Sequence, residues 1–229
     1  MNVKVSENNH IKEEMVLLLN QNESVYISQN KIKNDSVKKY YLKNKDLQGY
    51  QAYLLNNDRK SLMNYFIWKK NNEYVYQIKS GLKIIQYNES LPVLNWQILN
   101  NSSQEISGFK VQKAETVYEG KKYYAWFSTE ININNGPFIF NGLPGLILKI
   151  QNEDSSYVIT IKEIKNESNL FPELEKGEKV IETKKENFYK ILKETLLEFQ
   201  DKFVNPQTVE LLDKRIKQYV DAKYLFGIN

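Results

Sequence analysis

Few residues in this chain could carry covalent or proton-transfer chemistry. The 229 residues include no cysteine, so a thiol nucleophile and a cysteine-based zinc site are excluded. The single histidine, His10, lies in a polar N-terminal stretch where nothing would hold a general base in place. A Ser–His–Asp triad is therefore not expected, and we predict no catalytic residue of this kind.

Carboxylates are the remaining candidates for acid–base or metal chemistry. Glu130 directly follows an aromatic run. A buried acid there would have a raised pKa or a charged partner, but acids at strand ends more often lie in water. Residues 152–154, Asn-Glu-Asp, offer oxygen ligands for a hard cation, yet they lack EF-hand spacing and their position favours a solvated turn. We predict neither a metal nor a cofactor.

A segment rich in glycine and proline stands near the middle of the chain. It contains Gly136-Pro137 and, a few residues later, Gly142-Leu143-Pro144-Gly145. It is not a phosphate-binding loop, because it lacks the Lys-Ser/Thr of a P-loop and does not open a helix. Glycine is needed where φ is positive or chains pack closely, and proline fixes φ. We predict a shaped loop over residues 136–145, with positive φ at Gly142 or Gly145, leading into a buried strand.

Aromatic side chains are the candidates for noncovalent binding. Tyr124 and Trp126 share one face of the strand predicted for residues 123–128, whose two faces are both apolar, so we expect a central strand with Trp126 mostly buried. Tyrosine and tryptophan can stack on bases. The net charge is only +4, however, and just two of the 32 basic residues are arginine, so no nucleic-acid partner is expected.

The elements that would position these residues follow from hydrophobic periodicity. Alternating apolar residues and turn signals predict an antiparallel meander with strands at 15–19, 24–28, 73–79, 82–87, 95–99, 109–118, 123–128, 146–150 and 157–164. Residues 1–12 are expected to be disordered. Residues 31–66 show no clear hydrophobic periodicity and are expected to form a loop and a short helix.

The last third of the chain is predicted to be helical. Thr183 and Glu186 have capping-box spacing, and apolar residues at helical intervals continue the helix to about residue 203. Asn205-Pro206 would start a second helix, which Gly227 would end. The predicted fold is α+β: a curved, mostly antiparallel sheet like a half-barrel, with both C-terminal helices packed on or beside it.

We expect one domain over residues 1–229, with a β-rich body at 13–165 and a helical part at 183–227. No run approaches the roughly 18 apolar residues of a membrane-spanning helix. The N-terminal residues lack the apolar core and cleavage site of a signal peptide.

Residues 142–147 form the motif GLPGLI, with Leu146 and Ile147 completing the segment described above. With it the chain resembles the GLPGLI family of Bacteroidetes proteins over roughly residues 15–200. The resemblance also involves Gly136, Pro137 and Phe140, and the segments SGFKVQKA (107–114), YAWFSTEI (124–131) and LNWQI (94–98).

The family has no established activity. Many members have cysteine where this chain has Val111, so no thiol role is implied. Members usually begin with a signal peptide. The resemblance therefore implies a mature protein, trimmed of its leader and exported to the periplasm or cell surface.

Two functions compete. The first is a non-enzymatic envelope protein that binds a hydrophobic ligand, a peptide or a protein partner on the concave face of its sheet. Trp96, Tyr124, Trp126 and Glu130 are the candidate binding residues. The second is a carboxylate-dependent hydrolase or peptidase-like enzyme in which Tyr or Lys side chains assist Glu130. We favour the first, because no catalytic constellation is evident in the sequence.

Overall fold

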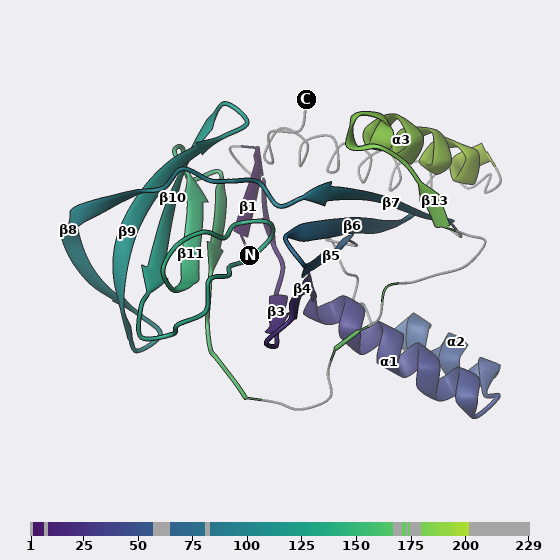
Figure 1. Cartoon of the computed structure of the whole chain (residues 1–229). Coiled ribbons are helices and arrows are strands. Elements are labelled where there is room, and N and C mark those ends of the chain that lie inside the picture. The colour runs from purple at the N-terminus through teal and green to yellow at the C-terminus, as the bar shows by residue number, and fades with distance from the viewer. Residues whose placement is uncertain are drawn as a thin grey trace.

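The structure is a computed structural model that describes residues 2–6, 9–56, 65–80, 83–166, 171–172, 174 and 180–201. The described strands form two sheets (Figure 1). Sheet A has seven strands in the order β2-β1-β12-β11-β10-β9-β8, and sheet B has six in the order β13-β7-β6-β5-β4-β3. Neighbouring strands are antiparallel, except that β13 runs parallel to β7. The α+β class and the antiparallel pairing are as predicted, but the structure has two sheets where one curved sheet was expected.

The strands of sheet A are β1 (Asn2–Ser6), β2 (Asn9–Lys12), β8 (Gln97–Ile106), β9 (Phe109–Tyr118), β10 (Lys121–Ser128), β11 (Leu146–Asn152) and β12 (Tyr157–Thr160). Those of sheet B are β3 (Met15–Leu19), β4 (Glu23–Ser28), β5 (Tyr65–Lys70), β6 (Glu73–Ser80), β7 (Lys83–Ser90) and β13 (Val180–Glu182). The three helices in the described part of the chain are α1 (Gln29–Lys43), α2 (Leu47–Asn56) and α3 (Lys185–Asp201).

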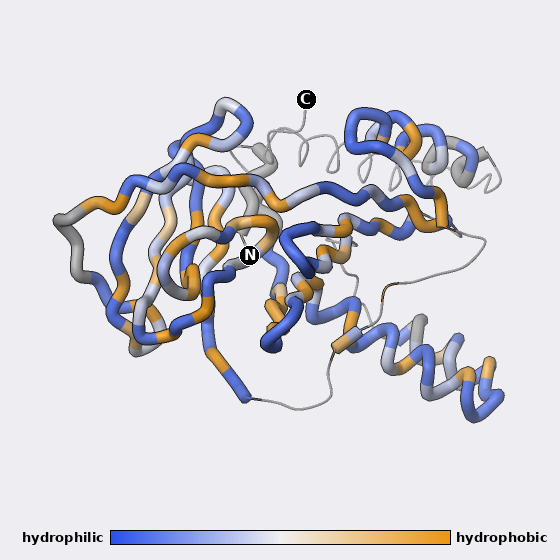
Figure 2. Tube along the Cα trace, in the orientation of Figure 1, coloured by the Kyte–Doolittle hydropathy of each residue, from blue (hydrophilic) through white to orange (hydrophobic). Residues whose placement is uncertain are grey.

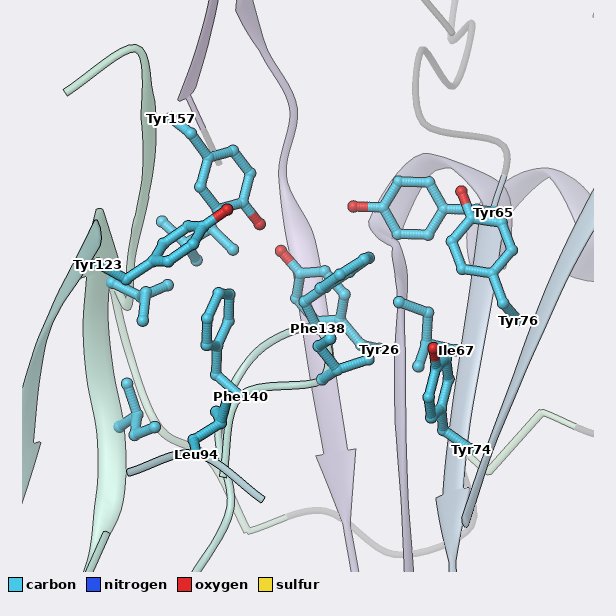
Figure 3. Packing of buried hydrophobic residues seen from close by; sticks show 14 of the residues in the cluster. Tyr26, Tyr65, Ile67, Tyr74, Tyr76, Leu94, Tyr123, Phe138, Phe140 and Tyr157 are labelled. Atoms are coloured by element: carbon cyan, nitrogen blue, oxygen red, sulfur yellow. The ribbon is translucent and has the colours of Figure 1, made fainter. Parts of the chain in front are cut away.

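One buried cluster joins the two sheets. Figure 3 shows aromatic side chains of sheet B and sheet A on either side of Phe138 and Phe140, which belong to the 136–145 loop. The tyrosines that it labels are Tyr26, Tyr65, Tyr74, Tyr76, Tyr123 and Tyr157. This shared core fills the space between the sheets. The faces of the two sheets that meet at this core are therefore covered and do not form the open concave face that was expected to hold a hydrophobic ligand.

Several segments differ from the sequence prediction. Residues 1–12, expected to be disordered, contain the hairpin β1–β2, which pairs with β12. Residues 31–66, expected to be loop and short helix, contain most of α1, all of α2 and the start of β5. Helix α1 has no buried residue, and Figure 2 shows it mostly hydrophilic, so it has no apolar stripe that could reveal it.

The first C-terminal helix is confirmed as α3. Its Phe188 is buried and contacts the rings of Tyr76 and Tyr87 edge-on, at centroid distances of 5.2 and 5.0 Å. This contact holds α3 on sheet B. The second predicted helix, from Pro206, lies outside the described residues. No helix in the described part of the chain is long and apolar enough to cross a membrane.

Candidate binding surface

The loop over residues 136–145 connects β10 to β11 and is built by close backbone packing. Both glycines at its end have positive φ, +92° at Gly142 and +154° at Gly145, which confirms the prediction. A Cβ built on Gly145 would lie 2.1 Å from the carbonyl oxygen of Ser128 on β10. A Cβ on Gly136 would lie 2.9 Å from the carbonyl oxygen of Phe140. The loop therefore lies against the strand that precedes it, and only glycine fits at residue 145.

The other residues of the loop and the motif pack on both faces of sheet A or lie exposed. Pro137 is buried and its carbonyl oxygen accepts a hydrogen bond from the Phe140 amide. Leu143 and Ile147 point into the shared core, whereas Leu146 belongs to a separate cluster on the opposite face. Gly142 and Pro144 are exposed. Most of the predicted motif residues thus shape the sheet and contribute no chemical group to a site.

Trp96 holds this loop. Its Nε1 donates a hydrogen bond of 2.7 Å to the carbonyl oxygen of Asn141, and its ring would lie 3.5 Å from a Cβ on Gly142. The side chain is half-buried against the shared core. The structure therefore places this candidate binding residue in a structural role.

Replacing Trp96 with phenylalanine is expected to lower the unfolding free energy by about 1 kcal/mol. The ring packing would remain, but the Asn141 carbonyl would lose its donor. Urea denaturation followed by circular dichroism measures this. A Trp96→Phe protein as stable as the parent would show that the hydrogen bond does not hold the loop.

A buried lysine ties the loop to sheet B, which sequence reasoning missed. Lys69 on β5 is 3% exposed, and its Nζ donates to Asn135 Oδ1 at 2.5 Å and to the Gly136 carbonyl oxygen at 2.7 Å. Asn135 Nδ2 in turn donates to Ser24 Oγ on β4 at 3.0 Å. Burial lowers the pKa of the Lys69 ammonium to about 7. The apolar run around it, YFIWKK, is the one sequence signal for this burial.

Glu130 lies in water just beyond the end of β10. Its Oε1 accepts a hydrogen bond of 3.3 Å from the backbone amide of Lys110, and its own amide donates to Ser128 Oγ. Across the described ranges, no group of three or more His, Asp and Glu side chains could hold a metal ion. Glu130 is thus an exposed residue just after β10 whose carboxylate accepts a backbone hydrogen bond.

Tyr124 and Trp126 do come together, on the face of sheet A opposite the shared core. Residues 123, 125 and 127 of β10 point into the core, while Trp126 lies in a second buried cluster with Val111, Leu146 and Leu148. Trp126 is 6% exposed, as predicted, and β10 is central, between β9 and β11. A β-bulge lies beside it, because Trp126 pairs with Lys149 and Phe127 with Ile147, leaving Leu148 as the extra residue. We call this side the outer face of sheet A.

Lysines alternate with these aromatic rings across three strands. Lys113 on β9 and Lys149 on β11 are both paired in register with Trp126, and their Nζ atoms lie 5.2 and 4.2 Å from its ring centroid. The Nζ of Lys113 is also 4.2 Å from the Tyr124 centroid, and that of Lys122 is 5.5 Å away. Lys122, Tyr124, Lys113, Trp126 and Lys149 form what we call the cation–aromatic row. Each ring thus has two ammonium groups within 5.5 Å of its centroid.

The charge of this row is only partly balanced. Lys122 forms an ion pair of 3.1 Å with Glu115. Within the described part of the chain, no carboxylate forms an ion pair with Lys113 or Lys149. Burial, and then the charge of Lys113, lower the pKa of the Lys149 ammonium. The part of the row around Trp126, with Lys113 and Lys149, therefore carries net positive charge.

Apolar side chains surround the row. Besides Tyr124, six half-buried residues pack against the cluster of Trp126: Leu17, Leu19, Ile106, Phe109, Ile131 and Ile161. Val117 on β9, which pairs with Lys122 on β10, is 63% exposed. Tyrosine and tryptophan with adjacent aliphatic side chains are the composition that protein interfaces favour. The outer face of sheet A is therefore the candidate binding surface.

A polar pocket of about 260 Å³ lies elsewhere, between β7 and the start of α3. Lys185 at this end of α3 is paired with Glu119 at 2.5 Å and with Glu89 at 3.6 Å. Lys185 is thus already paired with two carboxylates, which makes this pocket a weaker candidate for binding.

Comparisons with known proteins agree with the fold and assign no activity. A family described as "Protein of unknown function (Porph_ging)" matches residues 53–149, a stretch that includes β10, the loop and Gly145. No curated protein matches. Two solved structures of PNGF-II, in space groups C2 and P21, are similar at a TM-score of 0.52, with 17% and 16% identity over 82% and 85% of this chain. This chain spans only 31% and 32% of those chains. At such identity the likeness shows the fold alone.

Proposed function

We propose that this protein is a non-enzymatic binding module of the cell envelope or cell surface, and that it holds a peptide or protein partner on the outer face of sheet A. The observation that carries the proposal is the cation–aromatic row, which combines the buried ring of Trp126, the half-buried ring of Tyr124, an apolar surround and uncompensated positive charge. The sheet behind it is rigid, because β10 pairs along its length with β9 and β11.

The outer face is favoured over the space between the sheets. That space is filled by the shared core, in which Tyr26, Tyr123 and Phe140 are each at most 2% exposed. A hydrophobic ligand would have to displace packed rings. On the outer face, a partner could contact the half-buried Tyr124 and the exposed Val117 without entering this core.

Export is proposed from the resemblance to the GLPGLI family, whose members usually carry signal peptides. The family match over residues 53–149 includes the motif on which this resemblance depends. The alternative function, a hydrolase using Glu130, needs a second group positioned beside that carboxylate. The exposed Glu130 instead accepts a hydrogen bond from the Lys110 amide, so the binding module is the better supported function.

Replacing Tyr124 with alanine is expected to weaken partner binding by tenfold or more, the loss typical of an aromatic interface residue. Peptides would first be selected from a displayed random library on the immobilised parent protein. Their dissociation constants would then be measured in solution by fluorescence anisotropy.

Tyr40→Ala is the matched control, because Tyr40 is a 64% exposed tyrosine on α1. It should bind the selected peptides as the parent does. If the library yields no binder, or if the Tyr124→Ala protein binds every selected peptide normally, the outer face is not the binding surface.

A further inference from the structure

We infer that the cation–aromatic row selects an acidic partner: an extended peptide segment whose Asp or Glu carboxylate lies between the ammonium groups of Lys113 and Lys149, over Trp126. The inference rests on the proposed function and adds the chemistry of the partner.

The placement of the two lysines suits one carboxylate. Lys113 and Lys149 come from strands on opposite sides of β10, and both direct Nζ toward the Trp126 ring. The two ammonium groups are therefore within about 10 Å of each other, with the indole beneath them. A carboxylate has two oxygens and can accept a charge-assisted hydrogen bond at each. One acidic side chain can thus be bound from both sides.

The electrostatics favour an anion at this point. The neighbouring Lys113 charge and partial burial both disfavour the ammonium form of Lys149. A carboxylate between them would compensate both charges and raise the pKa of Lys149 again. The apolar ring below excludes water from one side, which strengthens the attraction.

The surroundings favour a peptide over a sulfated polysaccharide or a free phosphate. Val117, the cross-strand partner of Lys122, is exposed, and Phe109 and Ile131 are half-buried against the cluster of Trp126. An extended peptide can present acidic and apolar side chains within a few ångströms of each other. Sulfate and phosphate groups carry no apolar side chains that would cover these residues.

The inference predicts that the protein prefers an acidic peptide to a neutral one, and that Lys113 and Lys149 cause this preference. A labelled peptide that alternates glutamate with valine should bind the parent protein at least tenfold more tightly than the same peptide with glutamine in place of glutamate. In the Lys113→Gln/Lys149→Gln protein this preference should disappear, while the glutamine peptide binds as before. Fluorescence anisotropy at increasing salt should show a salt dependence that is weaker in the double variant.

Lys110→Gln removes one positive charge from β9, the strand of Lys113, at an exposed residue outside the row, and should keep the preference. Lys113→Arg/Lys149→Arg keeps both charges and should retain it as well. Equal binding of the two peptides by the parent would overturn the inference and leave the proposed function standing. Binding of neither peptide would also overturn the inference, whereas the proposed function falls only if the random library yields no binder or the Tyr124→Ala protein binds every selected peptide normally. Tighter binding of heparin or inorganic phosphate than of the acidic peptide would show a different class of ligand and overturn the inference.

Discussion

Replacing Gly145 with alanine is expected to lower the unfolding free energy by about 3 kcal/mol or more, or to prevent folding. The new Cβ would lie 2.1 Å from the Ser128 carbonyl oxygen and 2.7 Å from its carbonyl carbon. Both are backbone atoms of β10, which cannot move away without breaking its pairing with β9 or β11. The φ of +154° is also one that L-residues rarely adopt. Steric overlap and backbone strain therefore add.

The measurement is thermal and urea unfolding followed by circular dichroism, with Gly108→Ala as the control. Gly108 has a φ of +85°, but nothing lies within 4 Å of a Cβ built there. Its substitution should cost only about 1 kcal/mol, from strain. Gly142→Ala, with a φ of +92° and Trp96 at 3.5 Å, should be closer to the control. A Gly145→Ala protein as stable as Gly108→Ala would show that β10 yields to the extra methyl group.

The local parts of the fold were predictable from the sequence. Strands β9 and β10 form a hairpin whose alternation and glycine-containing turn are visible in residues 109–128, and the structure confirms both. Helix α3 follows from its capping residues and its apolar spacing. In each case the residues that determine the element lie within a few positions of one another.

The division into two sheets was not predictable in this way, because it depends on pairings between distant residues. β1 pairs with β12 through Val3 and Tyr157, and β13 pairs with β7 through Val180 and Ile84. No local sequence pattern indicates which two distant strands will pair. The burial of Lys69 is a similar case, since its acceptors come from the loop and not from its own hairpin.

Part of the candidate binding surface could be predicted from the sequence. Tyr124 and Trp126 follow from the alternation of β10, and the hairpin register would have placed Lys113 beside Trp126. Lys149 could not be placed, because the bulge at Leu148 shifts the register of β11 by one residue. Glu130 was chosen as the acid within the central motif, and Trp96 as an aromatic residue of a predicted strand. The structure places Trp96 just before β8 and Glu130 just after β10.

Lys69 is expected to make the protein more stable as the pH rises from about 7 to about 9.5. Burial lowers the pKa of this lysine from 10.5 to about 7 in the folded protein. Between these values the unfolded chain binds a proton that the folded protein has released. Raising the pH therefore disfavours unfolding, by up to about 1.4 kcal/mol per pH unit from this one group. Below pH 7 both states bind the proton and the contribution is constant.

The test compares the parent with Lys69→Met, which is unbranched, only one atom shorter than lysine, and cannot titrate. Urea unfolding free energies would be measured across this pH range, and the difference in slope isolates Lys69 from all other groups. The range stops below pH 10 because burial raises the pKa of Tyr65 and Tyr74, so stability from the tyrosines is lost at higher pH. The parent should gain stability with pH while Lys69→Met stays flatter. Equal slopes would mean that the ammonium stays charged throughout, held by Asn135 Oδ1 and the Gly136 carbonyl oxygen.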